Sequence, residues 1–320
     1  MSKILVTGGS GFVGSQTIIE LLKAGHDPYI TDSTVKPWIR NLLPEDQIFE
    51  RDFTFIPEDV EFDAVLHLAA MHNVTDSMTN PGKYYSTNVN NMQKFLENVV
   101  ARNIKNVVYA SSSSVYGNAG LQHFALSETT PTQPISPYST TKAIGEMMLR
   151  DYTTVYGINH ISLRYFNVSG ADPGCELGYT QTPATHLIPT VCKNINEGNP
   201  VIIYGTDYRT LDGTSIRDYT HVSDIAVGNV QALDYLISGG DSHTINLAGG
   251  QGYTVGDVVT ACSYCVNADP EIIRAERRDG DAHRLVADIT KADDILDWRP
   301  KYTLMEMINH AWEWEVKNAK

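Results

Sequence analysis

The chain is poor in cysteine and in positive charge and has no long apolar run. Its 320 residues include 4 cysteines, too few for a disulfide framework in a chain this long. The 24 basic residues are outnumbered by 38 acidic ones, so a net charge of -14 leaves no broad basic face for nucleic acid or an anionic membrane. No apolar segment approaches the roughly 20 residues of a membrane span. With no basic and apolar leader before Lys3, we expect a cytoplasmic protein.

Two of the cysteines, Cys262 and Cys265, are close in sequence. A pair at this spacing can bind a metal or cycle between thiol and disulfide. It falls in a stretch with helical character, residues 258–267, and no second pair accompanies it. We therefore expect a structural role for both cysteines and no metal site.

The first half of the chain alternates short β-branched or apolar runs with longer segments of helical period. We expect strands at residues 3–7, 28–31, 64–68, 106–110 and 160–164, and helices at residues 88–102 and 138–156. This alternation is typical of βαβ units around a parallel sheet. It predicts a doubly wound α/β domain over residues 1–168, to which part of 216–248 returns, and a smaller mixed α/β domain over 169–320.

A glycine-rich turn follows the first strand. Gly8, Gly11 and Gly14 lie between that strand and a helix expected to reach Lys23. In a dinucleotide-binding Rossmann fold the first glycine allows the tight turn, the second lets the backbone approach the pyrophosphate, and the third lets the helix pack on the strand. The same pattern without a ligand is a turn and nothing more, but its place between strand and helix favours a dinucleotide site.

Asp32 ends the next strand, eighteen residues after Gly14. A carboxylate there accepts hydrogen bonds from the adenosine ribose diol and repels a 2'-phosphate, which favours NAD over NADP. The alternative is a turn residue at the end of a strand.

A tyrosine and a lysine, Tyr138 and Lys142, are four residues apart on one expected helix and share a face. The strand at 106–110 runs into Ser111, Ser112, Ser113 and Ser114 at the sheet edge where such folds bind their ligands. Lowering a tyrosine pKa from about 10 to about 7 needs roughly 4 kcal/mol, which a nearby lysine and the positive charge of NAD could supply. We expect Tyr138 to act as a general base.

These features together resemble the extended short-chain dehydrogenase/reductase family, and within it the UDP-glucose 4-epimerases. The segments that carry the resemblance are residues 112–117 (SSSVYG), 136–138 (SPY), 163–167 (LRYFN), 170–173 (GADP), 204–222 (YGTDYRTLDGTSIRDYTHV), 275–281 (AERRDGD) and 297–300 (DWRP). The resemblance implies oxidation of the sugar at C4 by tightly bound NAD, followed by hydride return to the opposite face. Tyr138 is then the base, Lys142 holds the nicotinamide ribose, and Ser112 binds the 4'-oxygen.

The resemblance also implies two sets of binding residues. Beside the glycines and Asp32, the NAD site matches Phe12, Val13, Asp52, Phe53, Leu68, Ala69, Ala70, Asn88 and Phe166. Burial alone would explain Leu68, Ala69 and Ala70. The UDP site matches Asn167, His186, Leu187, Tyr204, Arg217, Tyr219, Arg278 and Asp281. A diphosphate needs arginines even on an acidic protein, although a surface ion pair is the alternative role for each.

Three positions depart from the commonest pattern of these epimerases. His72 stands where a lysine beside the sugar is common, His186 where an asparagine is frequent, and Leu285 where a tyrosine or a smaller residue gates sugar size. Leucine has intermediate bulk, so N-acetylated UDP-sugars are expected to fit if Leu285 is the gate. The alternative at all three positions is a packing residue that has no effect on substrate selectivity.

Two other functions share this fold. A nucleotide-sugar 4,6-dehydratase uses an acidic pair after its catalytic Ser or Thr, where this chain has Ser113 and Ser114. A non-enzymatic NAD-sensing protein typically loses the tyrosine or the lysine, and this chain keeps both. The helices expected at 88–102 and 138–156 also resemble the pair through which relatives form homodimers.

Overall fold

The computed structural model describes residues 1–318, and its largest element is a seven-stranded parallel sheet. The strand order is β10-β6-β5-β4-β1-β2-β3, so the winding direction reverses between β1 and β4. The predicted doubly wound fold is therefore confirmed. The strands are β1 (Lys3–Thr7), β2 (Asp27–Asp32), β3 (Ile48–Glu50), β4 (Ala64–His67), β5 (Asn106–Ser112), β6 (Asn159–Tyr165) and β10 (His243–Leu247).

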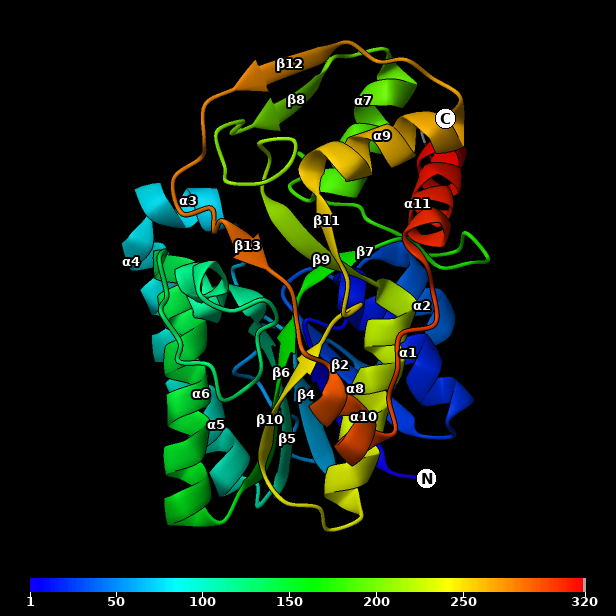
Figure 1. The fold of residues 1–320 in the computed structure, drawn as a ribbon. Helices are drawn as coiled ribbons and strands as arrows, with labels where there is room; N and C mark the ends of the chain where they lie inside the picture. The colour runs from blue at the N-terminus through cyan, green and yellow to red at the C-terminus, as the bar shows by residue number, and fades with distance from the viewer. Residues whose placement is uncertain (319–320) are drawn as a thin grey trace.

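Helices cover both faces of this sheet, with α5 and α6 on one side and α1 and α8 on the other (Figure 1). Side chains alternate between the two layers, since Ile4 and Val6 pack in the α1/α8 core and Leu5 packs in the α5/α6 core. The helices and helical turns of this part are α1 (Phe12–Lys23), α2 (Pro37–Leu42), η1 (Glu45–Gln47), α3 (Val74–Thr79), α4 (Pro81–Tyr85), η2 (Ser86–Asn91), α5 (Met92–Ala101), η3 (Ser113–Leu121), α6 (Pro137–Tyr156) and α8 (Val222–Ile237).

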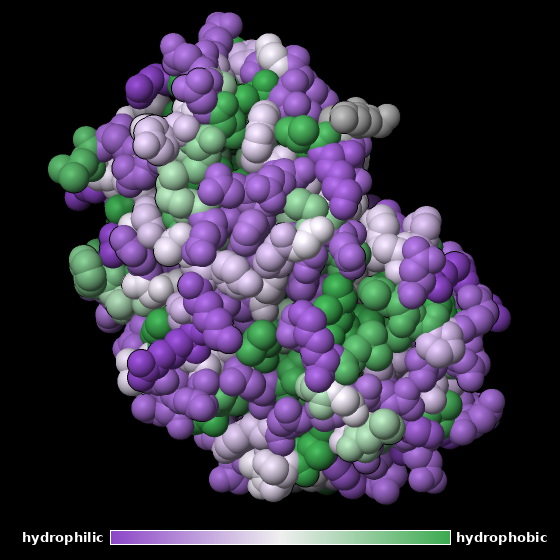
Figure 2. Space-filling model, turned by 90° about the vertical axis from the view of Figure 1, so that its right-hand side faces the viewer, coloured by the Kyte–Doolittle hydropathy of each residue, from purple (hydrophilic) through white to green (hydrophobic). Residues whose placement is uncertain are grey.

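A smaller second part lies above the carboxyl ends of the main strands (Figure 1). One of its sheets has the order β11-β9-β13 with β7 paired to β9, and the other pairs β12 with β8. Its elements are β7 (Asn167–Ser169), α7 (Leu187–Glu197), β8 (Val201–Tyr204), β9 (Ile216–His221), β11 (Gly252–Thr254), α9 (Val255–Val266), β12 (Ile272–Ala275), β13 (Arg284–Leu285) and α11 (Leu304–Asn318). Helix α10 (Thr290–Leu296) returns to the larger part and packs on α8 and β10. Figure 2 shows the two unequal lobes from the side, with apolar side chains gathered in patches on the larger one.

The predicted helix at 88–102 differs at its start. The segment Ser86–Asn91 is a π-helix, and the α-helix begins at Met92. The buried Asn88 side chain turns inward, where its amide donates to Met71 O at 2.9 Å and to Thr141 Oγ1 at 3.0 Å. The residue that makes these bonds to distant segments lies within the π-helix. Such wider helical turns are common at functional sites.

The chain returns to the main sheet after the smaller part begins. Strand β10 pairs with β6 at the edge of the sheet, and α8 packs on α1. Both lie within 216–248, the segment predicted to return. No helix among residues 1–318 combines the length and the apolar character needed to cross a bilayer.

Candidate active site

A cavity of about 740 Å³ lies at the carboxyl ends of the main strands, and residues of the smaller part also line it. Most of the predicted site residues line it. They are Gly8, Gly11, Phe12, Val13, Gly14, Asp32, Asp52, Phe53, Leu68, Ala69, Ala70, His72, Ser112, Tyr138, Lys142, Phe166, Asn167, His186, Arg217, Asp281 and Leu285. The structure therefore brings residues from both halves of the chain to one cleft.

The glycine turn forms the cradle at one end of this cavity. Gly8 has a left-handed φ of 71°, and a Cβ on it would lie 2.9 Å from Ala69 N. A Cβ on Gly14 would lie 2.3 Å from Gly8 O, so only glycine lets α1 pack so closely on the turn. No side chain caps the start of α1 at Gly11. Its first N–H groups are thus left for a ligand, and this geometry fits a dinucleotide pyrophosphate.

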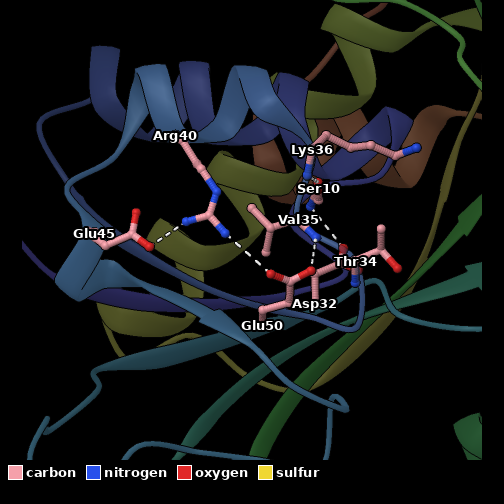
Figure 3. A network of polar contacts seen from close by, with 8 residues as sticks. All are labelled: Ser10, Asp32, Thr34, Val35, Lys36, Arg40, Glu45 and Glu50. Carbon is pink, nitrogen blue, oxygen red and sulfur yellow. Dashed lines mark hydrogen bonds and ion pairs between the residues drawn. The ribbon is translucent and has the colours of Figure 1, made fainter.

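Asp32 lies beside the cradle, where the adenosine ribose would bind (Figure 3). Its carboxylate accepts hydrogen bonds from Ser10 N at 3.0 Å and Thr34 N at 3.1 Å. Burial raises the pKa of Asp32, while these two N–H groups and the charge of Lys36 act in the opposite direction. The carboxylate is fixed by the turn and keeps acceptor capacity for a ribose diol.

A second carboxylate supports the same turn. Glu50 accepts from Val35 N at 3.3 Å and pairs with Arg40 at 3.3 Å, and Arg40 also pairs with Glu45 (Figure 3). Because Glu50 raises the pKa of Asp32, it adds negative potential at this end of the cavity. Two carboxylates here oppose a 2'-phosphate and favour NAD over NADP.

Helix α6 carries the predicted catalytic pair. Ser136 caps it with a reciprocal bond to Ser139, Pro137 occupies its first turn, and Gly157 ends it with a φ of 66°. The predicted extent of this helix is therefore confirmed. Tyr138 and Lys142 are both buried in the cavity wall, and the Lys142 ammonium donates to Ala110 O at 2.6 Å.

The environment of these groups changes their acidity. Burial raises the pKa of Tyr138, and its hydrogen bond with Ser112 acts against that rise. Burial lowers the pKa of Lys142 to about 7, against the effect of Glu146. The protein's own groups therefore do not lower the tyrosine pKa as the sequence suggested. The lowering needs a further positive charge in the cavity.

Five of the lining residues belong to the predicted substrate site: Asn167, His186, Arg217, Asp281 and Leu285. The Asn167 amide donates to Asp218 O at 2.9 Å, which ties β7 to β9. His186 is neutral near pH 7 because burial, with the neighbouring His72, lowers its pKa to about 4. These side chains offer a cation and several neutral polar groups to an extended ligand.

Five predicted site residues do not line the cavity itself. Asn88 lies behind its wall and holds the Met71 backbone by two hydrogen bonds. Tyr219 is buried in β9, and Leu187 begins α7. The remaining two lie further out, where Arg278 stacks over the Tyr204 ring at 5.0 Å and pairs with Asp281. This stack connects the outer surface to the cavity through Asp281.

Arginines gather around this outer stack despite the negative net charge. Burial lowers the pKa of His283, and Arg277, Arg217, Arg209 and Arg284 lower it further. Burial raises the pKa of the nearby Tyr208, and Arg278 is one of the charges that act against this rise. The positive potential is therefore local, as a diphosphate-binding site on an acidic protein requires.

Sequence reasoning missed a loop, residues 179–181, that lines the cavity. His72 Nε2 donates to Gln181 Oε1 at 2.9 Å, and the Tyr179 hydroxyl lies 3.0 Å from His186 Nδ1. The Tyr179 ring also packs edge-on against Phe12, with 5.5 Å between ring centroids. The contacts with His72 and Phe12 join residues that are far apart along the chain, so the local sequence of the loop does not signal them.

The two neighbouring cysteines lie away from this cavity. Cys262 is buried in the apolar core of the smaller part and hydrogen-bonds with Cys192, while Cys265 Sγ lies 3.8 Å from Met305 Sδ. Within residues 1–318 no group of three His, Cys, Asp or Glu side chains is arranged to hold a metal ion. The surroundings of both cysteines are those of packing residues.

Comparison with known proteins decides the family. The model of the NAD dependent epimerase/dehydratase family matches residues 4–248. The chain belongs to this family. It is 35% identical to a UDP-glucose 4-epimerase of Halalkalibacterium halodurans over 98% of this chain and 96% of that protein.

Solved structures of family members superpose on the whole chain. The UDP-glucose 4-epimerase of Bifidobacterium longum, in complex with NAD+ and UDP, has a TM-score of 0.93 at 31% identity and covers 99% of each chain. The UDP-Glc/GlcNAc 4-epimerase of Campylobacter jejuni has a TM-score of 0.83 at 34% identity, covering 99% of this chain and all of that one. The likeness thus extends over both parts of the molecule.

Proposed function

We propose that this protein interconverts UDP-galactose and UDP-glucose by inverting the sugar at C4, with NAD retained as a prosthetic group. The observation that carries the proposal is that Ser112, Tyr138 and Lys142 share one cavity with the glycine cradle and Arg217. Relatives with this activity, about 35% identical over nearly the whole chain, support it.

The residues of the site supply acid-base chemistry and orientation. Bound NAD would supply a hydride acceptor and a positive charge near Tyr138. Tyr138 takes the proton from the 4'-hydroxyl and returns it, Ser112 holds the 4'-oxygen, and Lys142 stabilises the phenolate. Removing the C4 hydride and the hydroxyl proton leaves a 4-keto sugar, which can be reduced from either face once the ring has turned.

Two halves of the chain divide the binding in this proposal. Residues 1–168, with the returning part of 216–248, hold NAD, and residues 169–320 mainly hold the nucleotide-sugar. The arginine cluster around Arg217 and Arg278 binds the diphosphate, so binding energy from groups remote from C4 retains the intermediate while the hexose moves. A cytoplasmic location remains a prediction.

The fold also allows a nucleotide-sugar 4,6-dehydratase. Elimination of water needs an acid and a base next to the catalytic serine. In this chain Ser113 and Ser114 follow Ser112, and Ser113 is buried. We therefore expect epimerised products and no deoxy sugar.

N-acetylated UDP-hexosamines are a second class of substrate. Leu285 is buried against the cavity and is smaller than a tyrosine. The similar structure from Campylobacter jejuni, whose name includes UDP-GlcNAc, supports this extension. Turnover of UDP-N-acetylgalactosamine is expected beside that of UDP-galactose, and its selective loss in Leu285→Tyr would identify the gate.

The decisive experiment is an incubation of the purified protein with UDP-galactose, followed by chromatographic identification of the product. We expect UDP-glucose without added NAD, together with one released NAD per chain on denaturation. Formation of a 4-keto-6-deoxy sugar would assign the dehydratase activity. A dialysed protein that holds no nucleotide and needs stoichiometric reductant would contradict the retained prosthetic group.

A further inference from the structure

A buried cluster of charges lies one helical turn beyond the catalytic lysine. Tyr138, Lys142 and Glu146 follow one another at intervals of four on α6, and the exposed fraction of Glu146 is 2%. The Glu146 carboxylate accepts from Ser111 Oγ at 2.5 Å, from Arg164 Nε at 2.9 Å and from Arg164 Nη2 at 2.7 Å. Three elements, α6, β5 and β6, therefore meet at one carboxylate.

Stability alone does not account for this cluster. Removing two charges from water costs several kcal/mol per ion, and apolar replacement of such a buried pair is often neutral or stabilising. The Glu146–Arg164 pair nevertheless lies beside a catalytic group instead of in the centre of an apolar layer. Ser111, which binds the carboxylate, is flanked by Ala110 and Ser112. Ala110 accepts the Lys142 bond and Ser112 bonds to Tyr138.

We propose that Glu146 is a positioning residue that keeps the buried Lys142 ammonium charged and directed at the end of β5, where Ser112 and Tyr138 meet. Ser111 and Arg164 hold its carboxylate in place. The inference rests on the proposed function, since a charged Lys142 matters there for ionisation of Tyr138. It adds a residue outside the reacting groups to that mechanism.

The groups that face Lys142 support this assignment. Tyr138 and Glu146 share its helix, and the Tyr109 ring of β5 lies 4.8 Å from its ammonium. From β4, His67 is neutral because burial lowers its pKa to about 3. Burial lowers the pKa of Lys142 to about 7, and the carboxylate that raises it is Glu146.

The test removes the charges without leaving one unpaired. Replacing Glu146 alone would strand the Arg164 guanidinium in the interior, so Glu146→Gln is combined with Arg164→Gln. We expect the alkaline limb of kcat to move down by a few tenths of a pH unit while KM changes less than about twofold, because the guanidinium that partly cancels the carboxylate charge is removed with it. An unshifted limb, or a rise in KM that accounts for the loss, would overturn the proposal.

For a second variant, which we expect to fold, the proposal predicts that the alkaline limb of kcat shifts in the opposite direction. Ser111→Ala removes a donor that offsets the carboxylate charge, so the alkaline limb moves up by a few tenths of a pH unit. Asp151→Asn, at an exposed carboxylate on the same helix, is the control and leaves the limb in place. A Ser111→Ala limb that moves down or stays would overturn the proposal even where the double variant does not fold.

A spectroscopic readout separates this inference from the proposed activity. The absorbance of phenolate at 295 nm, with Tyr138→Phe subtracted, follows ionisation of Tyr138 in the holoenzyme. We expect this ionisation at higher pH in the double variant than in the unaltered protein. Equal titration curves would contradict the inference, whereas an unaltered protein that interconverts no UDP-sugar would contradict the proposed function.

Discussion

At the scale of the residue, Tyr138 lies in surroundings that oppose its ionisation. Burial raises the pKa of its phenol, and Ser112 offsets the rise only in part. Tyr138→Phe removes the proton acceptor but keeps the ring in its buried position. We expect kcat to fall by about a hundredfold to ten-thousandfold, with the NAD content of the purified protein unchanged. Chromatographic assay of products and of released nucleotide measures both, and turnover like that of the unaltered protein would exclude Tyr138 as the base.

Burial in the fold keeps the His67 imidazole neutral. It is buried, its Nδ1 lies 2.7 Å from Thr7 Oγ1, and its ring stacks on Phe95. Its pKa is about 3 when folded, against about 6.5 when unfolded, so the unfolded chain binds the proton first as pH falls. The contribution of His67 to stability is complete above pH 6.5 and is lost as pH falls from there towards 3.

We therefore expect His67→Gln to be less sensitive to acid. Between pH 7.5 and 5, the free energy of unfolding of the unaltered protein should fall by about 2 kcal/mol more than that of the variant. Urea unfolding at both pH values gives this difference of differences, in which the fixed cost of the substitution cancels. Equal losses in the two proteins would show that His67 takes up no proton on unfolding.

At the scale of the element, the strand, glycine turn and helix that open the chain were predicted from local signals. The close approach at Gly14 involves neighbours within six residues, and α6 is bounded by Ser136, Pro137 and Gly157. The π-helix Ser86–Asn91 was missed because bonds from Asn88 to distant segments accompany it. Local sequence signals predicted these elements, whereas the departure at Ser86–Asn91 is accompanied by long-range contacts.

The packing of this first element can be tested at Gly14. A Cβ there would lie 2.3 Å from Gly8 O, against backbone that cannot turn aside. We expect Gly14→Ala to lower the free energy of unfolding by about 1–3 kcal/mol and to reduce bound NAD. Gly82→Ala is the control, since no atom lies within 4 Å of its added Cβ. Urea unfolding and nucleotide released per chain should separate the two variants, and identical behaviour would contradict the close approach.

At the scale of the whole molecule, the sequence predicted which residues share the cavity. It did not predict the long-range contacts among the residues that line it. The predicted catalytic side chains and most of the predicted ligand-binding residues share one cavity. The bridge from His72 to Gln181 joins positions 109 residues apart and could not be read from spacing. Strand β3, with three residues, and β10, which follows a long excursion of the chain, were likewise not placed individually. Their positions follow from the sheet that they complete.

We also propose a homodimer joined through the α5 and α6 face. These helices pack side by side on one flank of the molecule (Figure 1). Large apolar side chains of α6 remain exposed there, with Met147 at 54% and Val155 at 68%. These two exposed apolar side chains on one helix are the observation that supports the proposed contact.

The assembly can be tested by its mass in solution. Sedimentation velocity is expected to give a species of twice the 35.4 kDa chain. Met147→Glu combined with Val155→Glu would place two carboxylates in the contact, and a monomer is expected because a desolvated unpaired charge costs several kcal/mol. Lys94→Glu changes a charge on the neighbouring α5, and its sedimentation shows whether the contact extends to that helix. A double variant that still sediments as a dimer would move the interface away from α6.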